Sequence, residues 1–194
     1  GAPLSAVRQS VQAVVRSRLI EIVLLLLLLQ PAGAAAAPEA GWLSPVALAA
    51  APDGQSLFVA CATGKRVLQF DLAQRKTTRS VTMPNPPTGL TTSPDGKLLY
   101  VTGAAPESDV CLVEVKQGRV MAKFRAGHTA MAPVVSPDGK TLFVCNRFND
   151  DVSVFDLVTK KEKCRIPVRR ESVAAAITPD GKHLLVANLL HTGR

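Results

Sequence analysis

The sequence predicts an all-β fold: a β-propeller of four-stranded antiparallel blades, preceded by the helix of a signal peptide. Three observations predict it. A Pro-Asp-Gly turn recurs at nearly constant spacing, strand-like runs surround each copy of the turn, and an apolar leader follows basic residues at the N-terminus. A period of about 42 residues that holds several short strands is typical of propeller blades.

The recurring turn defines the first hairpin of each blade. The aspartates of its four copies are separated by 42, 43 and 42 residues. Proline presets φ for the second turn position, aspartate accepts bonds from nearby backbone N–H groups, and glycine adopts the positive φ that closes the turn. The turn residues are Pro52, Asp53, Gly54, Pro94, Asp95, Gly96, Pro137, Asp138, Gly139, Pro179, Asp180 and Gly181.

Four runs per repeat are expected to be strands. The run before the turn, such as 173–177, is apolar on both faces, as expected of the strand nearest the propeller axis. A third run follows the hairpin at 67–71, 110–114 and 152–156, and in the first and last of these it ends in an aspartate expected to cap the next turn. A fourth run, such as 164–168, alternates and should have one buried face.

These runs predict repeats at about 41–84, 85–127, 128–170 and 171–194. The last repeat stops after its second strand, so the chain should hold about three and a half blades, whereas closed propellers have about four to eight. We expect both ends to be truncated. The remaining blades should come from C-terminal sequence beyond Arg194 or, failing that, from a second chain.

The N-terminal segment has the order of a secretory signal peptide. Arg8, Arg16 and Arg18 precede the leucine-rich run 22–29, and the small-residue tract 32–37 follows it. We therefore expect a signal peptide over 1–37, a partial propeller over 38–194, and a periplasmic or secreted location, with membrane contact through the signal segment alone. An uncleaved anchor and a buried core helix are the alternatives.

The charge and the cysteines of the chain argue against two classes of function, nucleic-acid binding and covalent haem attachment. The formal net charge of +8 falls to +6 without the leader, and its basic residues are scattered rather than clustered with aromatics, so nucleic acid is not an expected partner. Cys61, Cys111, Cys145 and Cys164 form no Cys-x-x-Cys pair and no haem-attachment motif. They fall on strands that do not adjoin, and although an oxidising compartment would let cysteines pair, we expect buried free thiols.

The repeats resemble the YVTN family of β-propeller repeats, which is found in exported bacterial proteins. Residues 100–103 read Tyr-Val-Thr-Gly, and 58–61, 143–146 and 185–188 occupy the same place in the other repeats. Residues 152–156 and 159–160 match the next elements of the family. The resemblance covers 41–194, although Gly103 and Cys61 stand where the motif has Asn. WD40 repeats are an alternative, but Gly-His occurs once, at 127–128, and Trp-Asp is missing.

Polar residues gather in loops that should share one end of the propeller. If the first strand of each blade runs inward from that end, the loops joining second to third strands lie beside the segments joining blades. The candidate ligand- or partner-binding residues there are His128, Arg147, Asp150, Asp151, Arg169, Arg170 and His191, with Asn149 and Glu171 nearby. His183 should be exposed at the opposite end.

Three interpretations of these residues are open. They could be solvated charges that pair weakly. Arg147, Arg169 and Arg170 could bind an anion, or His128 and His191 could contact a metal or haem, although two histidines make an incomplete metal site. The sequence therefore predicts no metal site.

The sequence holds no Ser-His-acid arrangement and no glycine-rich phosphate loop, so no catalytic residue is predicted. We expect a scaffold that binds a protein or small ligand through its loops, with no cofactor in this segment. The family resemblance implies an alternative: the propeller part of a periplasmic cytochrome- or quinoprotein-type oxidoreductase, whose haem c or other redox centre lies outside this chain. A propeller lactonase is a third option.

Overall fold

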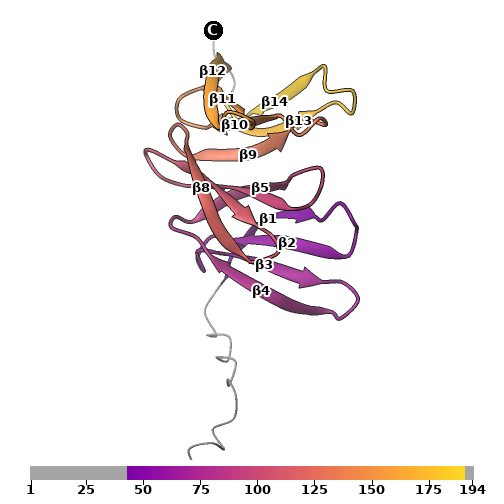
Figure 1. Ribbon diagram of the computed structural model, residues 1–194. Helices are drawn as coiled ribbons and strands as arrows, with labels where there is room; N and C mark the ends of the chain where they lie inside the picture. Colours follow the sequence, from indigo (N-terminus) through magenta and orange to yellow (C-terminus); the bar gives the residue numbers. More distant parts are fainter. Residues whose placement is uncertain (1–42, 191–194) are drawn as a thin grey trace, which may run out of the picture. The chain divides into compact units, whose positions relative to one another are not determined.

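The computed structural model describes residues 43–190, so the predicted signal peptide and His191 lie outside the described residues. The described part is all-β and consists of 14 strands. They form three four-stranded antiparallel sheets and one two-stranded sheet, which succeed one another along the molecule (Figure 1). None of residues 43–190 belongs to an apolar helix of membrane-spanning length.

Each four-stranded sheet is one propeller blade, with its strands in sequence order. Blade 1 consists of β1 (Pro45–Ala50), β2 (Ser56–Cys61), β3 (Arg66–Asp71) and β4 (Lys76–Thr82). Blade 2 consists of β5 (Pro87–Thr92), β6 (Leu98–Gly103), β7 (Asp109–Glu114) and β8 (Arg119–Arg125). Blade 3 consists of β9 (Ala130–Val135), β10 (Thr141–Asn146), β11 (Asp151–Asp156) and β12 (Lys161–Pro167). The half blade is β13 (Ser172–Ile177) paired with β14 (Leu184–Asn188). The predicted fold, with about three and a half blades, is confirmed.

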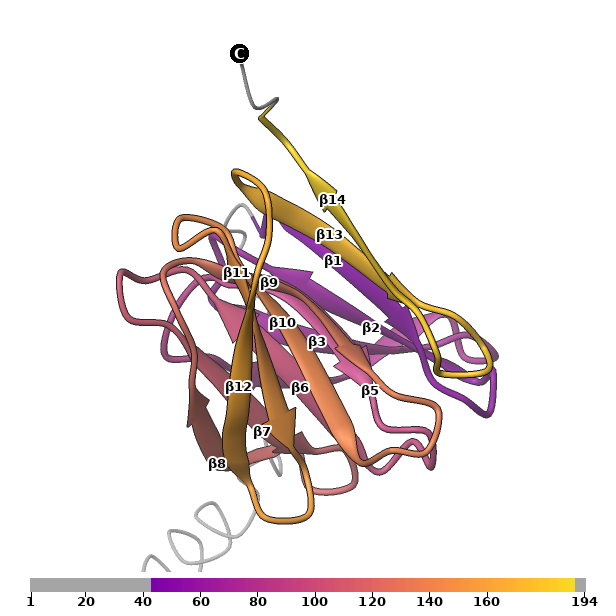
Figure 2. The ribbon, with the colours of Figure 1, turned by 90° about the horizontal axis from the view of Figure 1, so that it is seen from above.

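The first strand of each blade is the innermost one, as predicted. β1 contacts β5, β5 contacts β9, and β9 contacts β13, whereas the fourth strands close the opposite edges of their sheets. In Figure 2, β8 and β12 accordingly lie on the side away from β1, β5 and β13. The outer strands are rich in Lys and Arg, and charge on an open edge disfavours pairing with another sheet.

Apolar side chains fill the space between successive blades. Between blades 1 and 2, Phe58, Val67, Leu99 and Val113 belong to one buried cluster. Between blades 2 and 3, a second cluster includes Phe124 and Phe155, whose ring centroids are 5.5 Å apart. Burial of these faces holds the blades in fixed orientations and so positions the loops at their ends.

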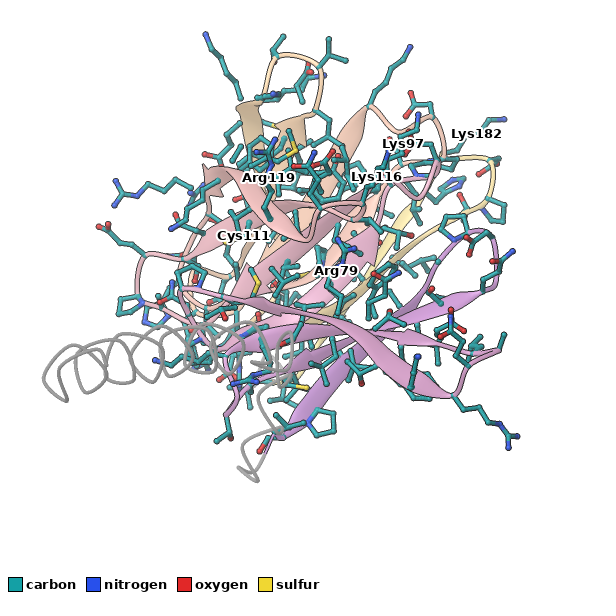
Figure 3. All side chains as sticks on the ribbon, turned by 60° about the horizontal axis from the view of Figure 1, so that its bottom comes forward. Arg79, Lys97, Cys111, Lys116, Arg119 and Lys182 are labelled. Atoms are coloured by element: carbon teal, nitrogen blue, oxygen red, sulfur yellow. The ribbon has the colours of Figure 1, made fainter. Side chains whose placement is uncertain are left out.

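An arginine adds a polar clamp between blades 1 and 2. Arg79 of β4 reaches the turn between β7 and β8, where its guanidinium donates to the carbonyl oxygens of Val115 at 3.0 Å and Lys116 at 2.5 Å (Figure 3). Gly118 leaves room for this side chain, because a Cβ there would meet the methylene groups of Arg79. The outer strand of one blade is thereby fastened to the next blade.

Each Pro-Asp-Gly sequence lies in a tight turn, and its glycine has φ between 69° and 71°. The aspartate accepts a hydrogen bond from the backbone N–H two residues later, as Asp138 does from Lys140 at 3.0 Å. In three of the turns a Ser or Thr hydroxyl also donates to the aspartate, for example Ser136 at 2.5 Å. These hydroxyl bonds, followed by the backbone bonds, lower the pKa of Asp95, Asp138 and Asp180.

The lowered pKa values predict an acid-sensitive fold. A carboxyl group whose pKa is lower in the folded state stabilises the protein above its unfolded pKa of about 3.9, and this stabilisation is lost as the pH falls through the folded pKa. Urea unfolding across this acid range should show stability falling with pH. Replacing the three hydroxyl donors, with Ser93→Ala, Ser136→Ala and Thr178→Val together, should flatten that fall. An unchanged acid dependence in the triple variant would contradict the assignment.

The alternation predicted for 164–168 does not produce a buried face. Every residue of β12 is exposed, whereas β8 at the same place in blade 2 buries Phe124. β12 is exposed because, within residues 43–190, the half blade offers no third and fourth strands to pack against it. The pattern was therefore interpreted correctly as a strand and wrongly as half-buried.

The cysteines are all free, and three of them are buried. Burial raises the pKa of the Cys61, Cys111 and Cys145 thiols, which keeps them protonated and apolar in character. Cys164 lies on β12 and is exposed, so the prediction of a buried thiol is wrong at this position. The reason is again the uncovered face of blade 3.

Gly89 marks the closest approach of blades 2 and 3. A Cβ at this residue of β5 would lie 2.8 Å from Cδ of Pro133 and 3.1 Å from the backbone nitrogen of Ala132 in β9. Gly89→Ala should therefore lower the free energy of unfolding by about 2 kcal/mol, because backbone must move. Gly64→Ala, where a Cβ meets only the side chains of Leu43 and Arg66, is the matched control and should cost less in denaturant unfolding. Equal losses would contradict this packing.

Candidate functional site

The loops between second and third strands and the segments between blades meet at one end of the blades, which we call the loop face. Backbone hydrogen bonds join them: Thr129 N–H donates to Ala105 O at 2.9 Å, and Val168 N–H to Asp150 O at 2.9 Å. The loop face is therefore the shared surface expected from the strand order. The Pro-Asp-Gly turns lie at the opposite end, the turn face, where His183 is exposed as predicted.

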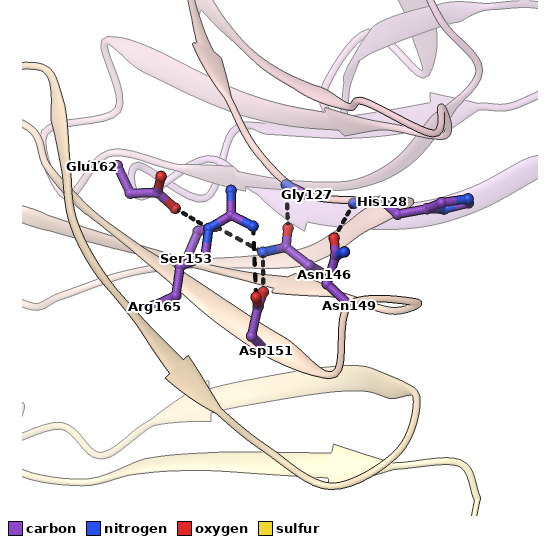
Figure 4. Close-up of polar contacts among 8 residues, drawn as sticks. All are labelled: Gly127, His128, Asn146, Asn149, Asp151, Ser153, Glu162 and Arg165. Atoms are coloured by element: carbon purple, nitrogen blue, oxygen red, sulfur yellow. Dashed lines mark hydrogen bonds and ion pairs between the residues drawn. The ribbon is translucent and has the colours of Figure 1, made fainter.

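Asn146 is the centre of the loop face in blade 3. It ends β10 and is fully buried. Its Oδ1 accepts a hydrogen bond from Gly127 N–H at 2.8 Å, and its Nδ2 donates to Asp151 Oδ1 at 2.6 Å and to Ser153 Oγ at 2.8 Å (Figure 4). An amide offers an acceptor and two donors at once, so asparagine can join the inter-blade segment to β11.

The segment before β9, residues 127–129, packs closely against Asn146. Gly127 is buried, and a Cβ there would lie 2.7 Å from Cγ of Asn146. The next residue, His128, donates its backbone N–H to Asn149 Oδ1 at 2.5 Å (Figure 4). The segment 127–129 is thus fixed by the last side chain of β10 and by a side chain of the loop between β10 and β11.

Arg147 is bound by an ion pair across the loop face. Its Nε and Nη2 donate to Oε2 of Glu171 at 2.9 Å and 2.6 Å, and both side chains are partly buried. The backbone N–H of Glu171 in turn donates to Asp150 Oδ1 at 2.8 Å. Asp150 and Glu171 have φ of 55° and 54°, so the carboxylates fix two loops in left-handed backbone conformations.

Asp151 also has structural partners. Besides the bond from Asn146, its Oδ2 lies 3.6 Å from Nη1 of Arg165 on β12, and Arg165 is paired with Glu162 at 2.8 Å. These carboxylates, rather than burial, raise the pKa of Arg165, and the Glu162 hydrogen bond contributes most. Asp151 therefore joins β10, β11 and β12 at the loop face.

The structure brings most of the predicted site residues together. His128, Arg147, Asp150 and Asp151 belong to one connected network, and Arg169 and Arg170 lie in the exposed segment that leads into β13. His191 lies outside the described residues, so the alternative in which it contacts a metal or haem together with His128 stays open. Within residues 43–190 no group of three metal-ligating side chains gathers.

Phe148 is the residue that the sequence interpretation missed. Of the Phe and Tyr side chains in residues 43–190, Phe148 is the only exposed one, with 50% of its surface accessible. Its ring meets the His128 ring edge-on at a centroid distance of 4.9 Å, and Cζ of Arg147 lies 4.9 Å from the ring centroid. A comparison of repeats could have found it, because Thr63 and Ala105 occupy this position in blades 1 and 2.

Two hollows lie at the turn face. One of about 310 Å³ separates the turns of blade 3 and the half blade, and one of about 120 Å³ separates those of blades 1 and 2. The first is lined by Ser136, Pro137, Asp138, Thr141, Phe143, Ile177, Asp180 and Gly181. None of the predicted site residues borders either hollow.

The sequence matches no protein-family model and no curated protein. Solved structures do resemble it. Hydrazine synthase of Kuenenia stuttgartiensis superposes with a TM-score of 0.71 and 24% identity over 80% of this chain and 45% of that chain. The β-propeller domain of Myceliophteria thermophila Cps50 (Swd1) gives a TM-score of 0.62 and 18% identity over 74% of this chain and 48% of that one.

The chain thus spans less than half the length of each of these proteins. At such identities the likeness concerns the fold, and function does not follow from fold. Residues 43–190 are consecutive blades of a β-propeller.

Proposed function

We propose that this chain is the propeller portion of an exported YVTN-type scaffold, which binds a protein or small ligand through its loop face. The observation that carries the proposal is the rigid loop network around an exposed Phe148. Recognition surfaces are commonly loops held by a rigid frame, and aromatic side chains often anchor them. The carboxylates of Asp150, Asp151 and Glu171 hold loops in place, so we assign them no catalytic role.

The proposed domain organisation follows the sequence. Residues 1–37 act as a signal peptide and 38–194 form the partial propeller, in the periplasm or outside the cell, with membrane contact through the signal segment alone. The Asn146 hub supports the YVTN assignment, because it gives the last residue of the motif a structural task. Nucleic acid is not a proposed partner, since basic residues do not gather with aromatics.

Further blades complete the propeller in this proposal. β14 has an open edge, and Leu185 on it is 62% exposed. Ser172 Oγ and Asn188 Oδ1 are buried without a hydrogen-bond partner. Strands that follow β14 in a longer chain would cover Leu185 and offer hydrogen-bond partners near the two buried oxygens, and sequencing the gene past Arg194 would identify them as further Pro-Asp-Gly repeats.

A photocrosslinking experiment in cells tests the binding role. A benzoylphenylalanine at position 148 should form a discrete adduct in the exported fraction, because Phe148 lies at the centre of the proposed surface. The same probe at Leu72, which is exposed on the turn face, is the matched control and should not form that adduct. Identical products from both positions, or none from 148, would count against a loop-face binding role.

The second candidate is a non-catalytic propeller within a periplasmic redox assembly. The likeness in fold to hydrazine synthase over 80% of the chain is compatible with it. In this case the redox centre, for example haem c, lies outside this chain. Haem staining and an absorption spectrum of the exported full-length protein distinguish the two candidates. A covalently bound haem supports the redox assembly, whereas a folded protein without haem supports the binding scaffold.

A further inference from the structure

Blade 1 packs on blade 2 with one of its two faces, and it lies at one end of the row of described blades (Figure 1). The face toward blade 2 contributes Phe58, Val67 and Val81 to the buried cluster between the two blades. Because side chains alternate between the two faces of a strand, the residues in between point to the other side of the sheet. We call that side the free face of blade 1. It is formed by Leu48, Leu57, Val59, Leu68 and Phe70.

The free face consists of apolar side chains in rows across three strands. Leu48, Val59 and Leu68 are paired across β1, β2 and β3, and Leu57 is paired with Phe70. Leu48 is 66% exposed, and the other four side chains are half-buried. A connected apolar patch on the surface of a soluble protein marks a place where another element packs.

Blade 2 has the same rows at the same places, and there they form an interface. Leu90, Val101 and Cys111 are paired across β5, β6 and β7, and Leu99 is paired with Val113. All five side chains are buried and belong to the cluster that packs on blade 1. Leu90, the counterpart of the exposed leucine of β1, is only 7% exposed. The free face of blade 1 is therefore the repeat equivalent of the blade 2 face that packs on the preceding blade.

The later repeats keep the same residues at the centre of this face. Leu142 and Val144 hold the places of the free-face leucine and valine of β2, and both are fully buried against blade 2. Leu184 and Val186 hold these places in β14. In blades 2 and 3 the pair serves packing on the preceding blade. Blade 1 retains this pair and thus retains a surface made for a preceding blade.

The third strand determines what kind of element can cover the free face. In the interface between blades 1 and 2, Val113 of β7 is buried in one cluster with Val67 of β3 and Val81 of β4, and the three border one small hollow. A third-strand side chain is thus covered by the third and fourth strands of its neighbour. The free-face residues of β3 need the same cover. A two-stranded element, such as the half blade of a second copy, does not provide it.

We propose that the free face of blade 1 closes the ring, and that the last blade of the longer chain packs on it. That blade covers the free face with a surface built like the one that Phe58, Val67 and Val81 form toward blade 2. It carries an aromatic residue on its second strand, as Phe58, Tyr100 and Phe143 do in the three complete blades. The inference rests on the further blades of the proposed function, and it names the surface on which they close.

Thiol labelling of the full-length protein tests the closure. In a Cys164→Ser background, Leu48→Cys should react with a maleimide about tenfold more slowly than Val158→Cys, because the last blade covers position 48. Val158 is the matched control: it is 73% exposed in the turn between β11 and β12, and its counterpart Lys116 is exposed in blade 2, which has neighbours on both faces.

Two further measurements accompany the labelling. The three buried cysteines, which should react only after addition of urea, show that each variant is folded. Light scattering at the labelling concentration shows whether the protein is a monomer. Slow labelling of Leu48→Cys in a folded monomer supports the closure.

Two outcomes would overturn the inference. Labelling of Leu48→Cys as fast as Val158→Cys in the folded protein would mean that the free face stays open. Protection that occurs only in an oligomer and is lost on dilution would mean that a second copy covers it. The proposed function is tested separately, by the sequence past Arg194 and by crosslinking at 148. Further repeats and a specific adduct, together with fast labelling of Leu48→Cys, would retain the proposed function and reject the closure.

Discussion

Asn146→Ala is expected to lower the free energy of unfolding by about 4 kcal/mol, because it leaves several buried polar groups without partners. The side chain is fully buried and makes hydrogen bonds to Gly127, Asp151 and Ser153. Alanine would remove these bonds and open a small cavity between the inter-blade segment and β11. Equilibrium unfolding in urea or guanidinium measures the loss.

Asn188→Ala is the matched control for this experiment. Asn188 holds the same place in the repeat, but in the part of the chain that the structure describes its Oδ1 lacks a hydrogen-bond partner and no third strand of the half blade receives its amide. The expected loss is under about 1 kcal/mol. Similar losses for the two variants would mean that the Asn146 hydrogen bonds do not hold blade 3 together.

Gly127→Ala is expected to cost about 3 kcal/mol, because the added methyl group overpacks a buried site and displaces a hydrogen bond. The new Cβ would lie 2.7 Å from Cγ and 2.8 Å from Cβ of Asn146, and it would also meet Asn149 Oδ1. Relief requires the segment 127–129 to move away from the loop between β10 and β11.

Gly54→Ala separates crowding from backbone strain. A Cβ at Gly54 meets nothing within 4 Å, but its φ of 69° disfavours any other residue, with an expected cost of about 1 to 2 kcal/mol. Denaturant unfolding of both variants should rank Gly127→Ala as the more damaging. A smaller loss for Gly127→Ala would show that the inter-blade segment is not tightly packed on Asn146.

Local chemistry explains why the blades could be predicted from the sequence. The Pro-Asp-Gly turns fix their hairpins through bonds within a few residues, as Asp138 does with Ser136 and Lys140. Asp156 likewise caps the next turn, and backbone N–H bonds lower its pKa. Features encoded in short stretches and repeated along the chain can be recognised without knowledge of the neighbouring blade.

The exposure of β12 and Cys164 could not be predicted in the same way. The alternation of apolar and polar residues in 164–168 indicates which side chains share a face of the strand. Whether that face is covered depends on strands of the next blade. In the half blade these strands do not occur among the described residues. The buried face of β8, which does have a complete neighbour, shows the arrangement that the pattern normally indicates.

The loop face was only partly predictable. Strand order alone placed Arg147, Asp150 and Asp151 at one end, but their pairing with Glu171, Asn146 and other groups is a tertiary property. Attention to polar residues left Phe148 out, although comparison with Thr63 and Ala105 distinguishes it. Arg147, Asp150 and Asp151, which were predicted to bind a ligand, instead hold the loops together. The exposed side chain among them is the apolar Phe148.

Amide hydrogen exchange at the loop face tests the rigid recognition surface most directly. The backbone N–H groups of Gly127, His128 and Glu171 each donate to a side chain of another segment, although none belongs to a strand. They should exchange as slowly as amides at the centre of β10. Exchange near the rate of an unstructured chain would mean that the loops open freely in solution, and it would contradict a surface organised before binding.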